Sequence, residues 1–280
     1  MLRTSIAIIL LFFACVHAEA AIIFSDNFDS HSGDECIVNG DTAPTGWDQW
    51  MTDGISASHD SVTHYSGEIT ETGRGGSGKS LKLWRHSDSW VGSASYAGSL
   101  LYTASGYAAF TIRFYAKMPT ALNMYGGIGT KMFRLNTSGG EIYININPTG
   151  EEWHRGASKL QILTDTWRDI LSESEMEAIW DGDWHCWQFV FDLTAGTLSF
   201  YADGTLMETV NHGTTGSWDS YMQHFPLGNA QCTYWQNSWQ AFEVDDLIIA
   251  TTKGETDPDD AEPTPARKLN NVTGVRVTLH

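Results

Sequence analysis

Positive charge is scarce in this chain of 280 residues. Its 16 Lys and Arg side chains stand against 34 Asp and Glu side chains, which gives a formal net charge of −18 at pH 7. A protein that binds nucleic acid needs a basic surface to neutralise phosphates, so this composition argues against a nucleic-acid partner. It does not exclude an anionic glycan, because a few cations can cluster on one face. Many exported proteins are acidic simply for solubility.

Long apolar segments are absent after the N-terminus. Residues 1–20 combine a basic residue, an apolar run over 6–16 and small residues at Ala18 and Ala20. This pattern predicts a secretory signal peptide, and its apolar run is too short to span a bilayer. A bacterial lipoprotein acylated on Cys15 is the alternative. We therefore expect a secreted protein, extracellular or periplasmic, with no membrane insertion after signal cleavage.

Cysteine is sparse once the signal peptide is removed, leaving Cys36, Cys186 and Cys232. No CxxC or Cys/His spacing indicates a zinc site. An odd number in an oxidising compartment indicates one disulfide and one buried thiol. Cys36 falls in an early loop and Cys232 in a late one, which favours this pair, although the sequence leaves the pairing open.

Helical periodicity is nearly absent, whereas alternation with a period of two residues is frequent. Residues 109–147 hold three such runs, typical of strands with one buried and one open face. Residues 166–180 alone approximate helical spacing, so we expect one short surface helix there. Residues 73–79, GRGGSGK, lack the spacing of a phosphate-binding loop and predict a turn.

Roughly a dozen short strands with Gly-rich turns predict an all-β fold, an antiparallel β-sandwich. We expect one domain over residues 21–252. Residues 253–280 begin with an acidic, Pro-containing linker and end in a short C-terminal tail.

Four motifs in order give the chain a recognisable pattern. The segments at residues 107–119, 140–147, 183–204 and 241–250 resemble, in turn, a core strand, the catalytic strand, the Trp-His strand with its Asp-Gly hairpin, and the closing strand of the concanavalin A-like lectin/glucanase superfamily. The resemblance, distant from laminarinase-type glucanases and jelly-roll polysaccharide lyases, implies a jelly roll of two curved sheets with ligand on the concave one.

The resemblance also argues against one activity. The glucanase strand carries two carboxylates, which serve as nucleophile and acid/base. Glu141 falls at the nucleophile position, but Tyr143 replaces the following Asp, and Asn145 or Ile146 stands in place of the second Glu. Without a proton donor for the leaving group, hydrolysis of this type fails.

Two interpretations remain, together with a third in which the chain is a structural or adhesive surface protein. One is a polysaccharide lyase that cleaves a uronate polymer by β-elimination, which needs a base, an acid and groups that neutralise the uronate carboxylate. The candidates for proton transfer are Tyr143 with Tyr115 or His86. The candidates for holding the carboxylate are Arg113, Lys117, Asn145 and Asn147.

The other interpretation is binding of a polysaccharide without chemistry. Sugar rings pack on aromatic faces, and the chain has 12 Trp residues, most of which we expect in the core. The predicted binding residues join the polar set above to one carboxylate and several aromatic side chains: Glu141, Trp84, Trp153, Tyr234, Trp235 and Trp239.

A structural calcium ion is the one cofactor that we expect, and no organic cofactor is indicated. Asp26, Asp29, Asp245 and Asp246 lie near the first and last strands, which pair in jelly rolls. Calcium takes six to eight oxygen ligands, and the resemblance implies such an ion at this seam in many members. The alternative is a surface acidic patch without an ion.

Overall fold

The computed structural model describes residues 21–31, 46–47, 49–51, 57–59, 62–64, 67–70, 72–85, 99–118, 124–125, 130–148, 152–153, 158–225, 234–235 and 240–251. The predicted signal peptide, Cys36, Cys232, His86, Trp239 and the C-terminal segment lie outside these residues, so the expectations for them stay predictions. Within the described ranges, no helix is long and apolar enough to cross a bilayer.

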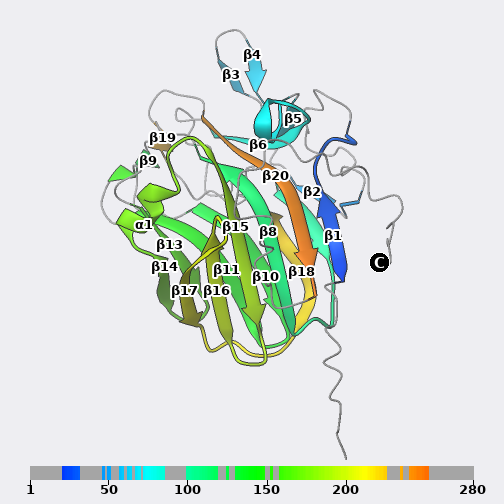
Figure 1. Ribbon diagram of the computed structural model, residues 1–280, viewed down its shortest axis with the longest axis vertical. Helices are drawn as coiled ribbons and strands as arrows, with labels where there is room; N and C mark the ends of the chain where they lie inside the picture. The colour runs from blue at the N-terminus through cyan, green and yellow to red at the C-terminus, as the bar shows by residue number, and fades with distance from the viewer. Residues whose placement is uncertain are drawn as a thin grey trace, which may run out of the picture.

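Two antiparallel sheets form the body of the molecule (Figure 1). The first, which we call the β8 sheet, has eight strands in the order β17-β16-β15-β8-β20-β6-β5, with β1 also paired to β20. Its strands are β1 (Ile22–Asp26), β5 (Gly67–Thr70), β6 (Ser80–Arg85), β8 (Ala109–Lys117), β15 (Trp184–Asp192), β16 (Thr197–Ala202), β17 (Thr205–Asn211) and β20 (Gln240–Ala250).

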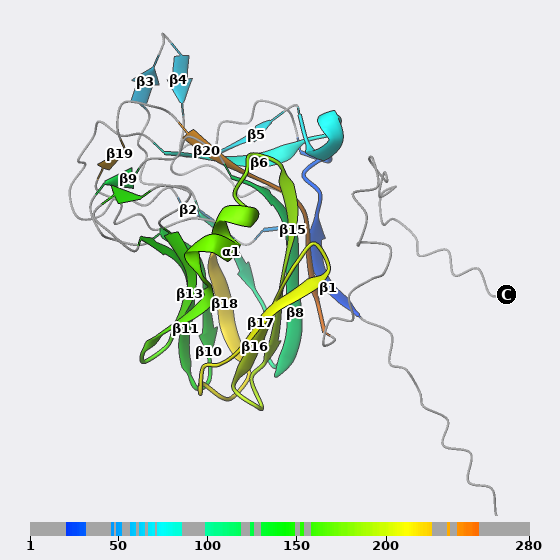
Figure 2. The same ribbon diagram turned by 60° about the vertical axis from the view of Figure 1, so that its left-hand side comes forward.

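The second, which we call the β11 sheet, has seven strands in the order β14-β13-β11-β10-β18-β7-β2. They are β2 (Gln49–Met51), β7 (Ser99–Thr103), β10 (Thr130–Thr137), β11 (Gly140–Pro148), β13 (Ser158–Leu163), β14 (Trp167–Leu171) and β18 (Trp218–Phe225). Figure 2 shows the two sheets facing each other. Smaller pairings join β12 (Glu152–Trp153), β9 (Met124–Tyr125) and β19 (Tyr234–Trp235), and β3 (Ala57–His59) with β4 (Val62–His64).

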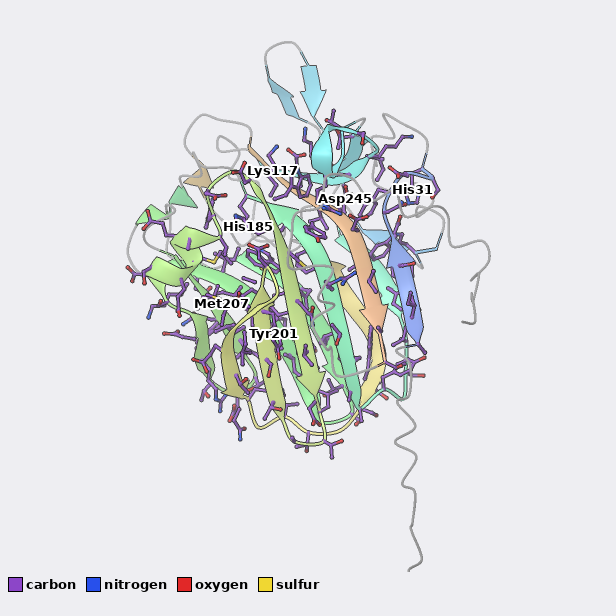
Figure 3. All side chains as sticks on the ribbon, viewed as in Figure 1. His31, Lys117, His185, Tyr201, Met207 and Asp245 are labelled. Carbon is purple, nitrogen blue, oxygen red and sulfur yellow. The ribbon has the colours of Figure 1, made fainter. Side chains whose placement is uncertain are left out.

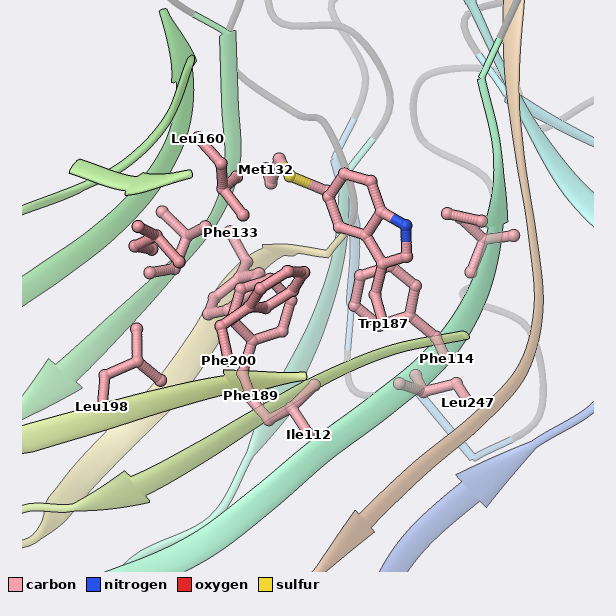
Figure 4. Close-up of a cluster of buried hydrophobic side chains, with 14 of the residues drawn as sticks. Ile112, Phe114, Met132, Phe133, Leu160, Trp187, Phe189, Leu198, Phe200 and Leu247 are labelled. Carbon is pink, nitrogen blue, oxygen red and sulfur yellow. The ribbon is translucent and has the colours of Figure 1, made fainter. Parts of the chain in front are cut away.

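The hydrophobic core fills the space between the sheets (Figure 4). Phe133 from β10 meets Phe189 from β15 edge to face, with ring centroids 5.0 Å apart. Trp187 packs beside Phe114 and Phe200 and is fully buried. Each such side chain contributes about 1.5–3 kcal/mol when it leaves water, so the apolar positions of the alternating runs hold the sandwich together. The predicted all-β antiparallel sandwich is confirmed.

The helical segment is shorter than predicted. Residues 167–171 form the edge strand β14, which pairs with β13, and only Glu173–Ala178 form the helix α1. Ser172 caps α1 through a capping box with Glu175, which fixes where the helix starts. The spacing of the apolar residues before Ser172 fits either a helix or a strand. These residues form a strand because they pair with the edge of β13. One short helix remains, as expected.

Candidate functional site

Side chains alternate between the two faces of a strand, and this separates the predicted site residues into two groups. On β11, Ile142 and Ile144 are fully buried in the core, so Tyr143 points to the outer face of the β11 sheet. On β8, Phe114 is fully buried, so Tyr115 points to the outer face of the β8 sheet. The core lies between these faces, and the two tyrosines point away from each other.

This arrangement corrects the predicted acid–base pair, because Tyr143 and Tyr115 cannot reach one sugar ring. Arg113 and Lys117 share the outer face of the β8 sheet with Tyr115 and are likewise separated from Tyr143. The alternation of β8 was interpreted correctly, but its strand belongs to the other sheet. Trp84 lies on β6 of the β8 sheet, opposite Ala241.

The outer-face residues of β8 already have partners within the protein. The Arg74 guanidinium carbon lies 3.7 Å from the ring centroid of Tyr115. The Lys117 ammonium lies 3.4 Å from a carboxylate oxygen of Glu243 and 5.9 Å from the ring centroid of Trp184. These contacts stabilise the β8 sheet.

The outer face of the β11 sheet carries a continuous band of polar side chains, which we call the polar strip. Strand pairing places Tyr143 opposite Arg134, Asn145 opposite Gln161, and Asn147 opposite Lys159. The strip comprises Arg134 from β10, Glu141, Tyr143, Asn145 and Asn147 from β11, Lys159 and Gln161 from β13, and Asp169 from β14.

One end of the strip is organised by Glu141. Its carboxylate accepts hydrogen bonds from the guanidinium of Arg134 and from the hydroxyl of Tyr143. The Arg134 guanidinium carbon also lies 5.4 Å from the ring centroid of Tyr143. The side chain at the glucanase nucleophile position is therefore neutralised by an arginine and held by a phenol.

The other end of the strip is organised by Asp169. The amide of Asn147 donates to Gln161 over 2.5 Å, and Gln161 donates to Asp169 over 2.5 Å. The ammonium of Lys159 donates to the second oxygen of Asp169 over 2.8 Å. This hydrogen bond raises the pKa of Lys159. Partial burial acts to raise the pKa of Asp169, but the hydrogen bonds from Lys159 and Gln161 outweigh it and hold that pKa below its usual value.

Asn145 lies at the centre of the strip. Its neighbours Ile144 and Ile146 face the core, so its side chain is on the outer face, yet only 3% of it is exposed. The amide oxygen is buried and has no hydrogen-bond partner among the residues that the structure describes. An unmade hydrogen bond at a buried polar atom costs about 1–3 kcal/mol, which a ligand that donates to this oxygen would recover.

Three chain connections meet in the small sheet β12-β9-β19 beyond one end of the strip. β12 follows β11 shortly after Pro148, and β9 pairs with both β12 and β19. The pairing aligns Trp153, Met124 and Trp235 in one row across these strands. Figures 1 and 2 both place β9 and β19 beyond the end of β13. The fold therefore places Trp153 on β12 and the predicted Tyr234 and Trp235 on β19, with β9 between these two strands.

The aspartates predicted to bind calcium lie on or next to β1 and β20, which pair with each other, and Figure 3 labels Asp245 there; each of the four has other partners. Asp26 accepts hydrogen bonds from the indole of Trp47 over 2.7 Å and from the backbone N–H of Phe28 over 2.8 Å, and it lies 2.8 Å from Nε2 of His31. Asp29 accepts from the backbone N–H of Lys79 over 2.8 Å.

Arg74, which lies in the glycine-rich turn at residues 73–79, binds the other two carboxylates, those of Asp245 and Asp246. Its backbone N–H donates to Asp245 over 2.8 Å, and its guanidinium donates twice to one oxygen of Asp246, over 2.6 and 3.0 Å. Burial, followed by the charge of Asp246, raises the pKa of Asp245 to about 7.

These contacts use carboxylate oxygens that the predicted calcium ion would need, and the calcium site stays a prediction. Calcium would need carboxylate oxygens that face a common centre, whereas these oxygens accept N–H groups and one guanidinium. In the part of the chain that the structure describes, no group of three or more His, Cys, Asp or Glu side chains could hold a metal ion. Positive charge at this seam comes instead from Arg74.

A separate charged cluster surrounds His185, at the start of β15 in the β8 sheet. Its Nδ1 lies 2.6 Å from Asp203 and its Nε2 lies 3.0 Å from Asp181. The bond to Asp203 contributes most to raising the pKa of His185, to about 9. The imidazolium ties the start of β15 to the turn before β17 and to the loop after α1.

Sequence reasoning missed four members of the strip: Arg134, Lys159, Gln161 and Asp169. The signal that was available is the alternation of residues 158–163, where Leu160 and Ile162 face the core. A strand paired with β11 in that register places Lys159 and Gln161 beside Asn147 and Asn145, but the sequence does not show which strands pair.

No family model and no curated protein matches this chain. A solved structure named "Cellulose induced protein, Cip1" is 13% identical with a TM-score of 0.51, and the match covers 82% of this chain and 97% of that one. A β-glucanase of Bacillus licheniformis is 14% identical with a TM-score of 0.45, over 82% of this chain and 97% of that one. The likeness to the first of these structures agrees with the predicted two-sheet jelly-roll fold, and at this identity it concerns the fold alone.

Proposed function

We propose that this protein is exported and binds a polysaccharide along the polar strip, with the neighbouring small sheet extending the contact, and that it does not cleave its ligand. The observation that carries the proposal is Asn145, a buried amide at the centre of an outward-facing polar band whose oxygen lacks a hydrogen-bond donor. Because the oxygen is buried beneath its neighbours, a ligand placed over this band supplies that donor only once those side chains move aside.

The side chains of the strip suit a carbohydrate. Amide, phenol and carboxylate groups both donate to and accept from hydroxyls, and they follow one another across four adjacent strands. A row of such groups matches an extended chain of sugar units rather than a compact ligand. The paired strands of the small sheet also carry Trp153 and Trp235, and sugar rings pack on aromatic residues of this type.

Binding without cleavage follows from what the strip holds. A retaining glycosidase needs two carboxylates about 5–5.5 Å apart, one of them able to give a proton. Glu141 is neutralised by Arg134, and Tyr143 and Asn145 follow it on β11 where the glucanase strand has further acids. The Tyr143–Tyr115 pair suggested for β-elimination is split between the two sheets, which counts against that form of the lyase alternative, whereas His86, the other candidate, lies outside the described residues.

The fold neighbour supports the proposal only through its name. "Cellulose induced protein, Cip1" is described by its induction by a polysaccharide, and it shares this fold over most of both chains. A carbohydrate ligand for the present protein is in line with that description.

Affinity electrophoresis in gels that contain single polysaccharides tests the proposal. We expect retardation by at least one polymer, and no unsaturated or reducing ends released from it. Asn145→Ala should weaken binding about tenfold, since one hydrogen bond to a buried group is worth about 1–1.5 kcal/mol. Tyr143→Phe should also weaken it. Tyr201→Phe, on β16 of the other sheet, is the matched control and should bind normally.

Two results would contradict the proposal. Unchanged binding by both strip variants would place the ligand elsewhere on the molecule. Absence of retardation in every gel would favour the structural or adhesive interpretation, in which the partner is a protein. Thermal unfolding of each variant separates a lost contact from a lost fold.

A further inference from the structure

The charges of the polar strip are matched in pairs. Arg134 is bound to Glu141, and Lys159 is bound to Asp169 at 2.8 Å. The strip therefore has two cations and two carboxylates among its eight side chains, and each cation forms an ion pair with a carboxylate of the same face. Arg113 and Lys117, the cations predicted to hold a uronate, face outward from the opposite sheet.

Among the side chains of this face that the structure describes, both cations of the strip are in such pairs, so a uronate would have to break a pair to reach either of them. If Arg134 turned to a ligand carboxylate, Glu141 would be left unneutralised beside a second negative charge. Like charges within a few ångströms repel. The same argument applies to Lys159 and Asp169. The strip thus opposes an anionic sugar rather than recruiting it.

The buried amide of Asn145 requires a donor, which the hydroxyls of neutral and of uronic sugars can both supply. Its oxygen is an acceptor without a donor among the described residues. An ionised carboxylate only accepts hydrogen bonds, whereas a hydroxyl donates one. The group that completes the strip is therefore a hydroxyl.

We infer that the polar strip recognises a neutral polysaccharide through its hydroxyl groups and discriminates against uronate polymers, with the Arg134–Glu141 and Lys159–Asp169 pairs as the elements that exclude anionic sugars. This inference rests on the proposed binding function and names the chemical class of the ligand.

The test compares hydroxyethyl cellulose and galactomannan with alginate and polygalacturonate in affinity gels and by titration calorimetry. We expect binding to a neutral polymer only. Its dissociation constant should change less than about twofold between about 50 and 500 mM NaCl, because no ion pair forms with the ligand. Binding to a uronate polymer should instead weaken steeply over this range.

Glu141→Gln is the informative variant. It keeps an acceptor for the Tyr143 hydroxyl but frees the charge of Arg134, so it should strengthen retention by polygalacturonate about tenfold, as expected for one charge-assisted hydrogen-bonded pair. Glu208→Gln on β17 of the other sheet makes the same change of net charge away from the strip and should leave retention by polygalacturonate unchanged.

The outcomes separate the two proposals. Salt-sensitive binding of the unmodified protein to a uronate polymer alone would overturn the inference and leave the proposed function standing. Equal gains by Glu141→Gln and Glu208→Gln would reduce the effect to net charge and overturn the role of the pair. Failure to bind any of the four polymers or any other glycan would contradict the proposed function itself.

Discussion

Arg74→Gln should destabilise the protein strongly, because Arg74 is the cation that holds the seam between β20 and the glycine-rich turn. The side chains of Arg74 and Asp246 are 18% and 17% exposed, so the pair is largely desolvated. Removing one partner of a buried pair costs about 3–5 kcal/mol, and this residual exposure favours the lower end. Loss of the cation–π contact with Tyr115, at 3.7 Å, adds about 1 kcal/mol.

The expected loss is therefore about 3–4 kcal/mol in the free energy of unfolding. Equilibrium urea unfolding measures it, with calcium chloride in one series and a chelator in the other. We expect the two series to coincide for the unmodified protein, because Arg74 neutralises the seam. Arg168→Gln is the control: the partner of Arg168, Asp165, is 79% exposed at 3.5 Å, so this change should cost less than about 1 kcal/mol.

The reasoning fails if Arg74→Gln unfolds within about 0.5 kcal/mol of the unmodified protein, the range of an ordinary surface substitution. It fails equally if the chelator lowers the stability of the unmodified protein. That result would mean that a metal ion, and not the arginine, neutralises Asp245 and Asp246.

Two further changes test the β8 sheet and the turn after β10. The pKa of His185 is about 9 when folded against 6.5 in a model compound, so its stabilisation is complete below pH 6.5 and is lost as pH rises through 9. Because Asp203 is 50% exposed, we expect about 1–2 kcal/mol, seen as a stability gap between the unmodified protein and His185→Gln that closes from about pH 6 to about pH 10. A gap that does not vary with pH would show that His185 is not charged. Gly139→Ala would set a Cβ 1.8 Å from the carbonyl oxygen of Thr215, and it should cost more than Gly106→Ala, which meets nothing within 4 Å and pays only for a φ of +85°. The positive φ should cost Gly106→Ala about 1–2 kcal/mol. Equal unfolding midpoints for the two variants would refute the close approach of Gly139 to Thr215.

The sequence predicted the faces of the strands but not the sheets to which they belong. Alternation identifies Tyr115 and Tyr143 as outward-facing residues, and both are. Which sheet a strand joins depends on hydrogen bonds to segments far away in the chain, such as β8 to β15 and β11 to β13. A period of two residues does not show which strands are hydrogen-bonded to each other. The outer faces of the two sheets were therefore predicted to form one surface.

The seam shows the same limit for charge. The pairing of the first strand with the last was predicted, and β1 does pair with β20. The residues 73–79 were predicted to be a turn, and they contain a 3-10 turn at Arg74–Gly76. What the sequence does not show is that this turn returns to Asp245 and Asp246 across 171 and 172 positions. Four aspartates near two paired strands look like a metal site until the groups that bind them are known, Arg74 for two of the four.

The two findings together change what the protein can do. A surface that neutralises a uronate needs cations without internal partners, and the cations of the polar strip and of the seam each meet a carboxylate of this chain. With its charges matched in pairs, the strip acts through hydrogen bonds, and its central amide, Asn145, lacks only a donor. The proposed recognition of hydroxyls therefore depends on where the cations are bound, which no local pattern of the sequence reveals.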